Sequence, residues 1–305
     1  MVRFTPWLAL LVSAFLSCGA SSPRKSLYEK QSTYTLIAVT EDTRGRRYLQ
    51  FDTSGALQSV VWPGQPLNLE LPYTRMSMVG LAFVPKPQRI LVVGLGGGAM
   101  PMFLRAVLPR AHIDVVDIDP DVVSVAGRYF GFREDARLKA HVADGRAFIE
   151  ASRPAYDLIF LDAYGPDSIP EHLGTVEFLA RVRARLTARG AVVGNVWEDP
   201  PNPLFASMLR TWREGFLQLY TFAVPGSGNR IFVGVAHPEL QTREALEARA
   251  QAWETRGALP FDLSKMVVEG YARVPASDVL TGTVLKDPRA EPPRPSAPRL
   301  EVPAP

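Results

Sequence analysis

Residues 89–98 read RILVVGLGGG, an aliphatic run that breaks abruptly into glycine, and the run IDVVDIDP follows it. An apolar run of this length, rich in β-branched residues, is typical of a strand buried on both faces of a parallel sheet. Gly94, Gly96 and Gly98 predict a turn in which backbone without Cβ atoms can approach a ligand closely. Asp117 ends the second run, and a carboxylate at a strand tip can accept both hydroxyls of a ribose. Together these residues predict a pocket for a nucleoside-containing cofactor.

The glycine pattern by itself leaves two alternatives open. The dinucleotide fingerprint has glycines at its first, third and sixth positions, and the sixth position counted from Gly94 is Ala99. Because alanine is permitted there, NAD binding stays an alternative on the pattern alone. The other alternative is a glycine-rich turn that binds nothing, and the spacing to Asp117 argues against it.

Composition and charge narrow the class of protein. The chain of 305 residues is 47% hydrophobic and 21% charged, which is typical of a globular enzyme with a sizeable core. Its formal net charge is only +3 and its arginines are scattered, so we expect no nucleic-acid partner. One cysteine and four separated histidines exclude a disulfide framework and lead us to expect no metal site. The chemistry must therefore come from carboxylates, aromatic side chains and backbone.

The two ends of the chain are expected to lie outside the fold. Residues 1–22 combine a short basic start, an apolar segment and small residues after it, which is the pattern of a secretory signal. Cys18 stands where a bacterial lipoprotein signal carries its acylated residue, although the residues before it depart from that pattern. An uncleaved anchor and ordinary cleavage after Ala20 are the alternatives. We therefore expect an exported chain, periplasmic or held on the membrane by a lipid, with a cytoplasmic chain as the alternative. Residues 288–305 are proline-rich and predict a disordered tail.

Between the ends the periodicity changes once. Residues 33–61 contain short alternating runs separated by turns, which predict antiparallel strands. From Arg89 on, apolar runs alternate with helical patterns, so we expect an α/β fold with a doubly wound, mostly parallel sheet. The expected elements are strands at 89–94, 113–117, 138–142, 156–162 and 190–196, helices near 99–108, 120–129, 173–187 and 203–217, and an antiparallel hairpin of 218–224 and 230–236 on the sheet edge. The expected domains are a small antiparallel β domain at 27–75, a nucleoside-binding domain at 76–240 and a helical extension at 241–287.

Ligands of such a sheet bind outside the carboxyl ends of its strands, so each polar residue at a strand end is a candidate. The third to fifth strands contribute Asp144 and Gly145, Asp162 and Tyr164, and Asn195 and Trp197. Asp144 stands directly before a helical segment, so capping of that helix explains it as well as ligand contact does. Asp162 follows the wholly apolar LIFL, which favours a functional role.

The order of a small β domain and then VVGLGGG, VDIDPDVV, HVADGRAF and YDLIFLDAYGPDSIP resembles the spermidine synthases, aminopropyltransferases built on the class I methyltransferase fold. The resemblance covers residues 27–236 and is greatest to the synthase-like domains that bacteria also fuse to membrane transporters. The later DVLTGTVLKD, residues 278–287, resembles the end of those domains more loosely.

This resemblance implies a methyltransferase-like Rossmann domain that binds decarboxylated S-adenosylmethionine, or S-adenosylmethionine itself. It implies that the glycine turn and Asp117 hold the nucleoside and that Asp144 with Gly145 meets the adenine. Asp162 would take the proton of an attacking small-molecule amine. That role also makes chemical sense, because an alkylamine with a pKa of about 10.4 is a poor nucleophile until a neighbouring base accepts its proton. Family members usually form dimers or tetramers, so a homodimer is a further expectation.

On the amine side the resemblance implies that Tyr73, Tyr164 and Asp167 bind the substrate, but three family residues are missing. The acid of the usual GGGDGG turn corresponds to Gly97, and the second acid of the fourth-strand loop corresponds to Gly165. The usual Tyr-His-Glu or Tyr-Gln-Glu of a strand at the pocket entrance appears here as Tyr-Thr-Arg at 73–75. The nucleoside half of the site is therefore better preserved than the amine half, and Asp167 is a candidate substitute acid.

Three hypotheses follow from these observations. The first is an aminopropyltransferase of the spermidine synthase type. The second is a transferase of the same fold that uses S-adenosylmethionine on a methyl acceptor. The third is a catalytically inactive, exported binding relative. Retention of Asp117, Asp144 and Asp162 favours the first two, whereas export favours the third because adenosyl cofactors are made in the cytosol.

Overall fold

The computed structural model describes residues 23–52, 56–153, 155–163, 169–198, 200, 202–257 and 259–288. The predicted signal with Cys18 and nearly all of the proline-rich tail lie outside these residues. So do Tyr164, Gly165 and Asp167, so their predicted roles stay predictions.

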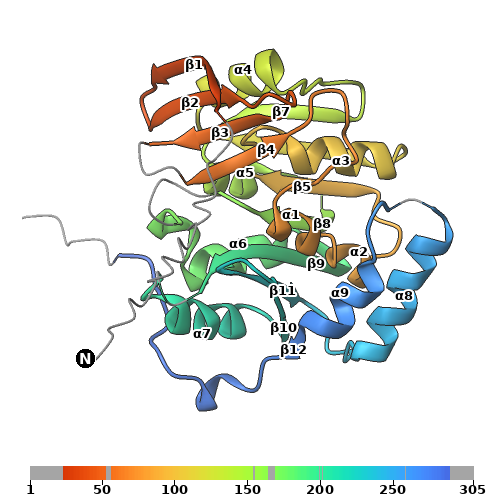
Figure 1. The fold of residues 1–305 in the computed structure, drawn as a ribbon. Helices are drawn as coiled ribbons and strands as arrows, with labels where there is room; N and C mark the ends of the chain where they lie inside the picture. Colours follow the sequence, from red (N-terminus) through yellow and green to blue (C-terminus); the bar gives the residue numbers. More distant parts are fainter. Residues whose placement is uncertain are drawn as a thin grey trace, which may run out of the picture.

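The described residues form two sheets, and the smaller is antiparallel (Figure 1). Its strands, in spatial order, are β1 (Lys25–Gln31), β2 (Leu36–Glu41), β3 (Arg47–Phe51) and β4 (Leu57–Val61). The antiparallel strands predicted within 33–61 are therefore confirmed. β1 escapes prediction because it is an edge strand whose sequence KSLYEKQ is mostly exposed and shows no apolar alternation.

The larger sheet contains eight strands within the described residues, in the order β12-β10-β11-β9-β8-β5-β6-β7. The mutually parallel strands are β5 (Arg89–Val93), β6 (His112–Asp117), β7 (Leu138–Val142), β8 (Tyr156–Leu161) and β9 (Leu186–Trp197), and the antiparallel ones are β10 (Gln218–Ala223), β11 (Asn229–Val235) and β12 (Tyr271–Arg273). The doubly wound, mostly parallel sheet is thus confirmed. The hairpin of β10 and β11 is not on the sheet edge, however, because β12 pairs outside β10. β12 is only three residues long, too short to show a period in the sequence.

Side chains of the parallel strands alternate between two apolar cores, one on each face of the sheet. Ile90 and Val92 of β5 lie in the first core, and Leu91 and Val93 lie in the second. The first face is covered by α1 (Pro72–Ser77), α2 (Gly80–Phe83), α3 (Ala99–Val107), α8 (Arg243–Thr255) and α9 (Leu263–Gly270), and the second by α5 (Gly145–Ala151), α6 (Val176–Ala184) and α7 (Phe205–Gly215). Helices on both faces explain why these strands read as continuous apolar runs.

The small sheet packs on helix α4 (Pro120–Tyr129) through a third core. Val122, Val125 and Phe130 contribute to it from the larger domain, and Ile37 and Leu49 from the small sheet. Helix α4 agrees with the helix predicted near 120–129. Pro120 lies in its first turn, and the side chain of Asp119 accepts a hydrogen bond from the N–H of Asp121 at 2.8 Å.

Two helical segments differ from the sequence-based expectation. The helix predicted at 173–187 is a 3₁₀ turn, η1 (Glu171–Leu173), followed by α6, which begins after the capping residue Thr175, while β9 already starts at Leu186. Residues 73–75, which correspond to a strand in the family pattern, lie in helix α1. Pro72 at its first turn favours helix there.

The C-terminal extension contributes α8, α9, β12 and a 3₁₀ turn, η2 (Ser277–Val279). It therefore adds a strand to the sheet as well as helices. None of the helices within the described residues combines the length and the apolar character needed to cross a bilayer.

Candidate active site

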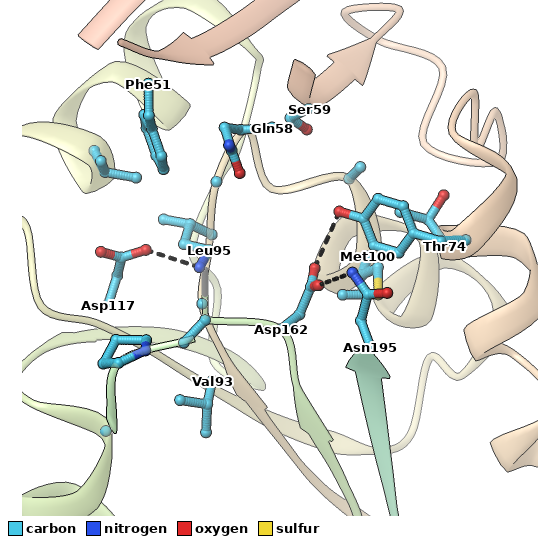
Figure 2. Close-up of a pocket in the computed structure, with 18 of the residues that line it drawn as sticks. Phe51, Gln58, Ser59, Thr74, Val93, Leu95, Met100, Asp117, Asp162 and Asn195 are labelled. Atoms are coloured by element: carbon cyan, nitrogen blue, oxygen red, sulfur yellow. Dashed lines mark hydrogen bonds between the residues drawn. The ribbon is translucent and has the colours of Figure 1, made fainter. Parts of the chain in front are cut away.

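A pocket of about 680 Å³ opens at the carboxyl ends of the parallel strands (Figure 2). Its polar lining follows the strand order, with Asn195 in β9, Asp162 after β8, the glycine turn after β5, Asp117 at the end of β6 and Asp144 after β7. β8 and β7 are separated by two strands, so Asp162 and Asp144 lie roughly 14 Å apart at a strand spacing of about 4.8 Å. The pocket is therefore elongated, and we call its two ends the Asp162 end and the Asp144 end.

In the glycine turn, the backbone after β5 packs directly against the backbone after β8. Gly94 has a φ of 99°, and a Cβ atom there would lie 2.3 Å from the carbonyl oxygen of Asp162. Gly96 and Gly98 also have positive φ values, of 52° and 78°. Gly145, after β7, is equally restricted, since its Cβ would lie 2.6 Å from Val93 Cγ1. The structure thus places all four predicted glycines where a side chain is disfavoured.

Asp117 points into the pocket beside this turn (Figure 2). Its Oδ2 accepts a hydrogen bond from the N–H of Leu95 at 2.9 Å, and its Oδ1 accepts one from the N–H of Asp119 at 3.0 Å. Burial raises the pKa of Asp117 in spite of these donors. Each carboxylate oxygen keeps a further lone pair, so the oriented group can still accept two hydroxyls of a ribose.

Asp144 fits both predicted explanations. Its Oδ1 caps α5 by accepting from the N–H of Ala147 at 2.8 Å, and its Oδ2 lies 2.7 Å from Nε2 of His172. Partial burial raises the pKa of Asp144, but these hydrogen bonds outweigh that effect and hold the pKa below its ordinary value. Asp144 and His172 both line the pocket, so a capping role does not remove Asp144 from the site. His172 cannot be inferred from sequence, because η1 alone brings it to Asp144.

Asp162 lies at the other end, between Tyr73 and Asn195. Its Oδ2 accepts from the Tyr73 hydroxyl at 3.2 Å, and its Oδ1 accepts from Asn195 Nδ2 at 3.0 Å (Figure 2). Burial raises the pKa of Asp162 to about 7, although both hydrogen bonds oppose that shift. A carboxylate with this pKa can accept a proton and release it again near neutral pH. The structure brings the predicted base and the predicted substrate-binding Tyr73 together.

A chain of amides extends from Asp162 into the β10–β11 hairpin. Asn195 Oδ1 accepts from Asn229 Nδ2 at 2.9 Å, and Asn229 is in turn hydrogen-bonded to the Ser227 hydroxyl. Ser227, Gly228 and Asn229 all line the pocket. The sequence predicts the hairpin, but it does not show that the turn of the hairpin reaches the pocket. The position of the turn depends on the antiparallel pairing of β11 with β9.

The small sheet closes the pocket from the opposite side, through Phe51, Gln58 and Ser59 (Figure 2). This packing also explains the missing acid at Gly97. A Cβ atom on Gly97 would lie 2.8 Å from Ser59 Oγ and 3.1 Å from Phe130 Cδ1. An acid at this position therefore has room only if the side chains of Ser59 and Phe130 shift.

The third departure from the family pattern, Arg75, is directed to the backbone. Its guanidinium donates to the carbonyl oxygen of Leu69 at 2.7 Å, and Arg75 is not among the described pocket-lining residues. Thr74 does line the pocket. Along 73–75, Tyr73 is thus the residue that reaches Asp162.

The charge of the pocket is negative. Among the described lining residues the acids are Asp117, Asp119, Asp144 and Asp162, and the one basic side chain is His172. Within the same part of the chain, no group of three or more His, Cys, Asp or Glu side chains is arranged to hold a metal ion. The site therefore suits a cationic small molecule with a nucleoside part.

Known proteins resemble this chain in sequence and in fold. A family model described as the spermine/spermidine synthase domain matches residues 70–228. The polyamine aminopropyltransferase of Vibrio vulnificus is 36% identical over 252 residues, which cover 80% of this chain and 82% of that protein. A probable spermidine synthase from Corynebacterium glutamicum shares the fold with a TM-score of 0.65 at 23% identity, over 76% of this chain and 93% of that chain. Human methyltransferase-like protein 13, solved in complex with SAH, has a TM-score of 0.57 and is 32% identical, over 63% of this chain and 94% of that chain. The chain therefore belongs to the spermine/spermidine synthase family.

Proposed function

We propose that the protein transfers an aminopropyl group from decarboxylated S-adenosylmethionine to a small-molecule amine. The observation that carries this proposal is Asp162, a partly buried carboxylate with a pKa of about 7, held by Tyr73 and Asn195 in the same pocket as a nucleoside-type turn. A catalytically inactive binding protein would not need a carboxylate whose pKa is raised to near neutrality and whose two oxygens are oriented by hydrogen bonds. This observation argues against the hypothesis of an inactive, exported relative.

The donor fits the chain's own residues along the elongated pocket. The glycine turn and Asp117 would hold its ribose, and Asp144 with Gly145 would face its adenine. A ligand bound in this way extends from the Asp144 end across β6 and β5 toward Asp162. Bound there, the donor supplies a carbon next to a positively charged sulfur, which is a good leaving group.

The protein's contribution to the reaction is to position the amine and to take its proton. As the amine nitrogen forms its new bond to that carbon, the carbon–sulfur bond breaks and methylthioadenosine leaves. Asp162 takes a proton from the amine, which frees the nitrogen lone pair for this attack, and later releases that proton to solvent. Tyr73 and Asn195 keep both carboxylate oxygens oriented during the transfer. No further co-reactant is required.

We propose an acceptor amine that one carboxylate is enough to recognise. Among the described residues Asp162 is the carboxylate at that end of the pocket, and its polar neighbours Asn195, Asn229 and Ser227 are neutral. A far ammonium group without a carboxylate partner loses several kcal/mol of stabilisation (about 3–5) when it is buried. Putrescine is therefore expected to be a poor acceptor.

A panel assay tests both the reaction and the acceptor. The purified chain is incubated with decarboxylated S-adenosylmethionine and a set of monoamines, diamines and polyamines, and the products are measured by mass spectrometry, with Asp162→Asn as the control. We expect an aminopropylated product that depends on Asp162, with putrescine a weak acceptor. Efficient spermidine formation would show that Asp167 or another group replaces the missing acids, and equal activity of the control would exclude Asp162 as the base.

Methyl transfer from S-adenosylmethionine is the second candidate, favoured by the likeness to a methyltransferase solved with SAH. The charge of the pocket argues against it. S-adenosylmethionine carries a carboxylate that the decarboxylated form lacks, and among the described lining residues the one basic side chain, His172, is at the Asp144 end. Calorimetry should therefore show tighter binding of the decarboxylated form, and the reverse order would favour methyl transfer.

We also propose that the chain is exported and acylated at Cys18, as the pattern of residues 1–22 suggests. Multiple acylation would anchor it firmly on a membrane, whereas a single acyl chain would anchor it marginally. A palmitate analogue should label the wild type and spare Cys18→Ala. An unlabelled, full-length chain in the cytosolic fraction would contradict this proposal.

A homodimer, proposed from the family resemblance alone, is tested by light scattering on the purified chain.

A further inference from the structure

The C-terminal residues 280–287, here called the strap, run from η2 across helices α7 and α6 (Figure 1). The strap crosses α7 first, at Gly282. A Cβ atom on Gly282 would lie 2.6 Å from the backbone nitrogen of Ser207, and its φ is +82°. Arg210 donates to the Gly282 carbonyl at 3.0 Å, and Ser207 Oγ accepts from the N–H of Thr283 at 3.1 Å. Only a glycine lets the strap lie this close to the helix.

Leu285 then joins the two helices. Its N–H donates to Thr211 Oγ1 of α7 at 2.9 Å, and its carbonyl accepts from the N–H of Val176, the first residue of α6, at 2.9 Å. Its side chain packs against the apolar core on this face of the sheet. The strap is thus held by directed backbone hydrogen bonds as well as by apolar contact.

The strap ends on a bidentate ion pair behind the pocket wall. The Asp287 carboxylate accepts from both terminal nitrogens of Arg146, at 2.7 and 2.6 Å, and from Thr175 Oγ1 at 2.7 Å. The backbone N–H of Asp287 donates to Glu177 Oε2 at 2.9 Å. Mainly through Arg146, these donors lower the pKa of Asp287 to about 2. Asp287 is therefore ionised at neutral pH.

Arg146 connects this ion pair to the pocket. It stands two residues after Asp144, and its guanidinium also donates to the carbonyl oxygen of His172 at 3.3 Å. His172 in turn contacts Asp144 at 2.7 Å, and both line the pocket. A continuous path of hydrogen bonds therefore leads from Asp287 to the Asp144 end.

We propose that Asp287 is a positioning residue, and that the strap fixes the wall formed by η1 so that Asp144 and His172 are preorganised for the adenine of the ligand. This inference rests on the proposed function for the nature of that ligand. Partly exposed ion pairs contribute little to the free energy of unfolding. Loss of the Arg146–Asp287 pair should therefore lower ligand affinity more than it lowers stability. The chemistry at Asp162, three strands away, should be spared.

Calorimetry with 5′-methylthioadenosine on the full chain tests this inference. Asp287→Asn should weaken binding about tenfold, because the oriented Arg146 fork is lost. The matched control is Asp278→Asn, the same substitution at an exposed residue next to the strap, and it should bind as the wild type does. In turnover assays Asp287→Asn should raise KM for the adenosyl donor while kcat stays within about twofold.

Two further variants keep the test decisive if Asp287→Asn fails to fold. Arg146→Lys keeps the charge but cannot make the bidentate pair, and Gly282→Ala lifts the strap from α7 while leaving the ion pair chemically intact. Both should weaken nucleoside binding in the same direction. Binding equal to that of the wild type in the folded variants would overturn this inference alone, whereas a wild type that binds no adenosyl compound would overturn the proposed function as well.

Discussion

Asp162 has a pKa that should be visible in the kinetics. Burial raises that pKa to about 7, and a base must be deprotonated to act, so kcat/KM should fall as the pH drops through about 7 and level off above about 8. The hydrogen bond from Asn195 lowers the pKa, so Asn195→Ala should move this acid limb to higher pH. Measuring kcat/KM across this range for both proteins checks the prediction, and an unmoved limb would contradict it.

Replacing the base should separate binding from chemistry. Asp162→Asn keeps the size and one acceptor oxygen of the side chain but cannot take a proton. We expect it to bind methylthioadenosine nearly as well as the wild type and to turn over at least about 10²-fold more slowly. Calorimetry and single-turnover measurements on the same preparation distinguish the two effects.

Asp117 should control nucleoside affinity instead. Asp117→Ala would leave the ribose hydroxyls and the N–H groups of Leu95 and Asp119 without their acceptor. The expected loss is about 1–3 kcal/mol, which is roughly tenfold or more in the Kd of methylthioadenosine. Equal calorimetric affinity of the variant and the wild type would show that the ribose is held elsewhere.

The elements around the glycine turn decide which side chains this site can carry. Gly97→Asp restores the usual family acid, but its Cβ would meet Ser59 Oγ at 2.8 Å and Phe130 Cδ1 at 3.1 Å. The substitution should lower the free energy of unfolding by about 1–3 kcal/mol in urea titrations. Adding Ser59→Gly, which removes the nearer contact, should recover part of the loss. If Gly97→Asp alone were as stable as the wild type, Ser59 and strand β4 would have to shift at little energetic cost.

The whole molecule places two sheets around one pocket, so the core between them should affect both stability and binding. Phe130 is fully buried in the core between α4 and the small sheet. Phe130→Ala should lower the free energy of unfolding by about 3–5 kcal/mol and also weaken nucleoside binding. Phe83→Ala, in the core on the first face of the large sheet, is the matched control and should destabilise the protein while sparing binding in the folded fraction. Equal effects of both variants on binding would contradict this coupling.

Local chemistry in the sequence was sufficient for the parallel strands, the glycine turn and the acids at strand ends. Runs such as RILVV are buried on both faces, so they can be recognised as strands without knowing which strands pair with them. The rule that ligands bind at the carboxyl ends of parallel strands then places Asp117, Asp144 and Asp162 in one pocket. β1 and β12 gave no such signal, because one is exposed and polar and the other is three residues long.

Contacts between distant segments were decided by the tertiary structure alone. Asn229 meets Asn195, His172 meets Asp144, and Asp287 meets Arg146, across separations of 34, 28 and 141 residues. Such pairs depend on strand order and on where a loop crosses a helix, and no local period encodes either. The sequence by itself therefore determined the fold class and the acids of the site. The tertiary structure decided which neighbours orient those acids and set their pKa values, because burial and hydrogen bonding exist only once the chain has folded.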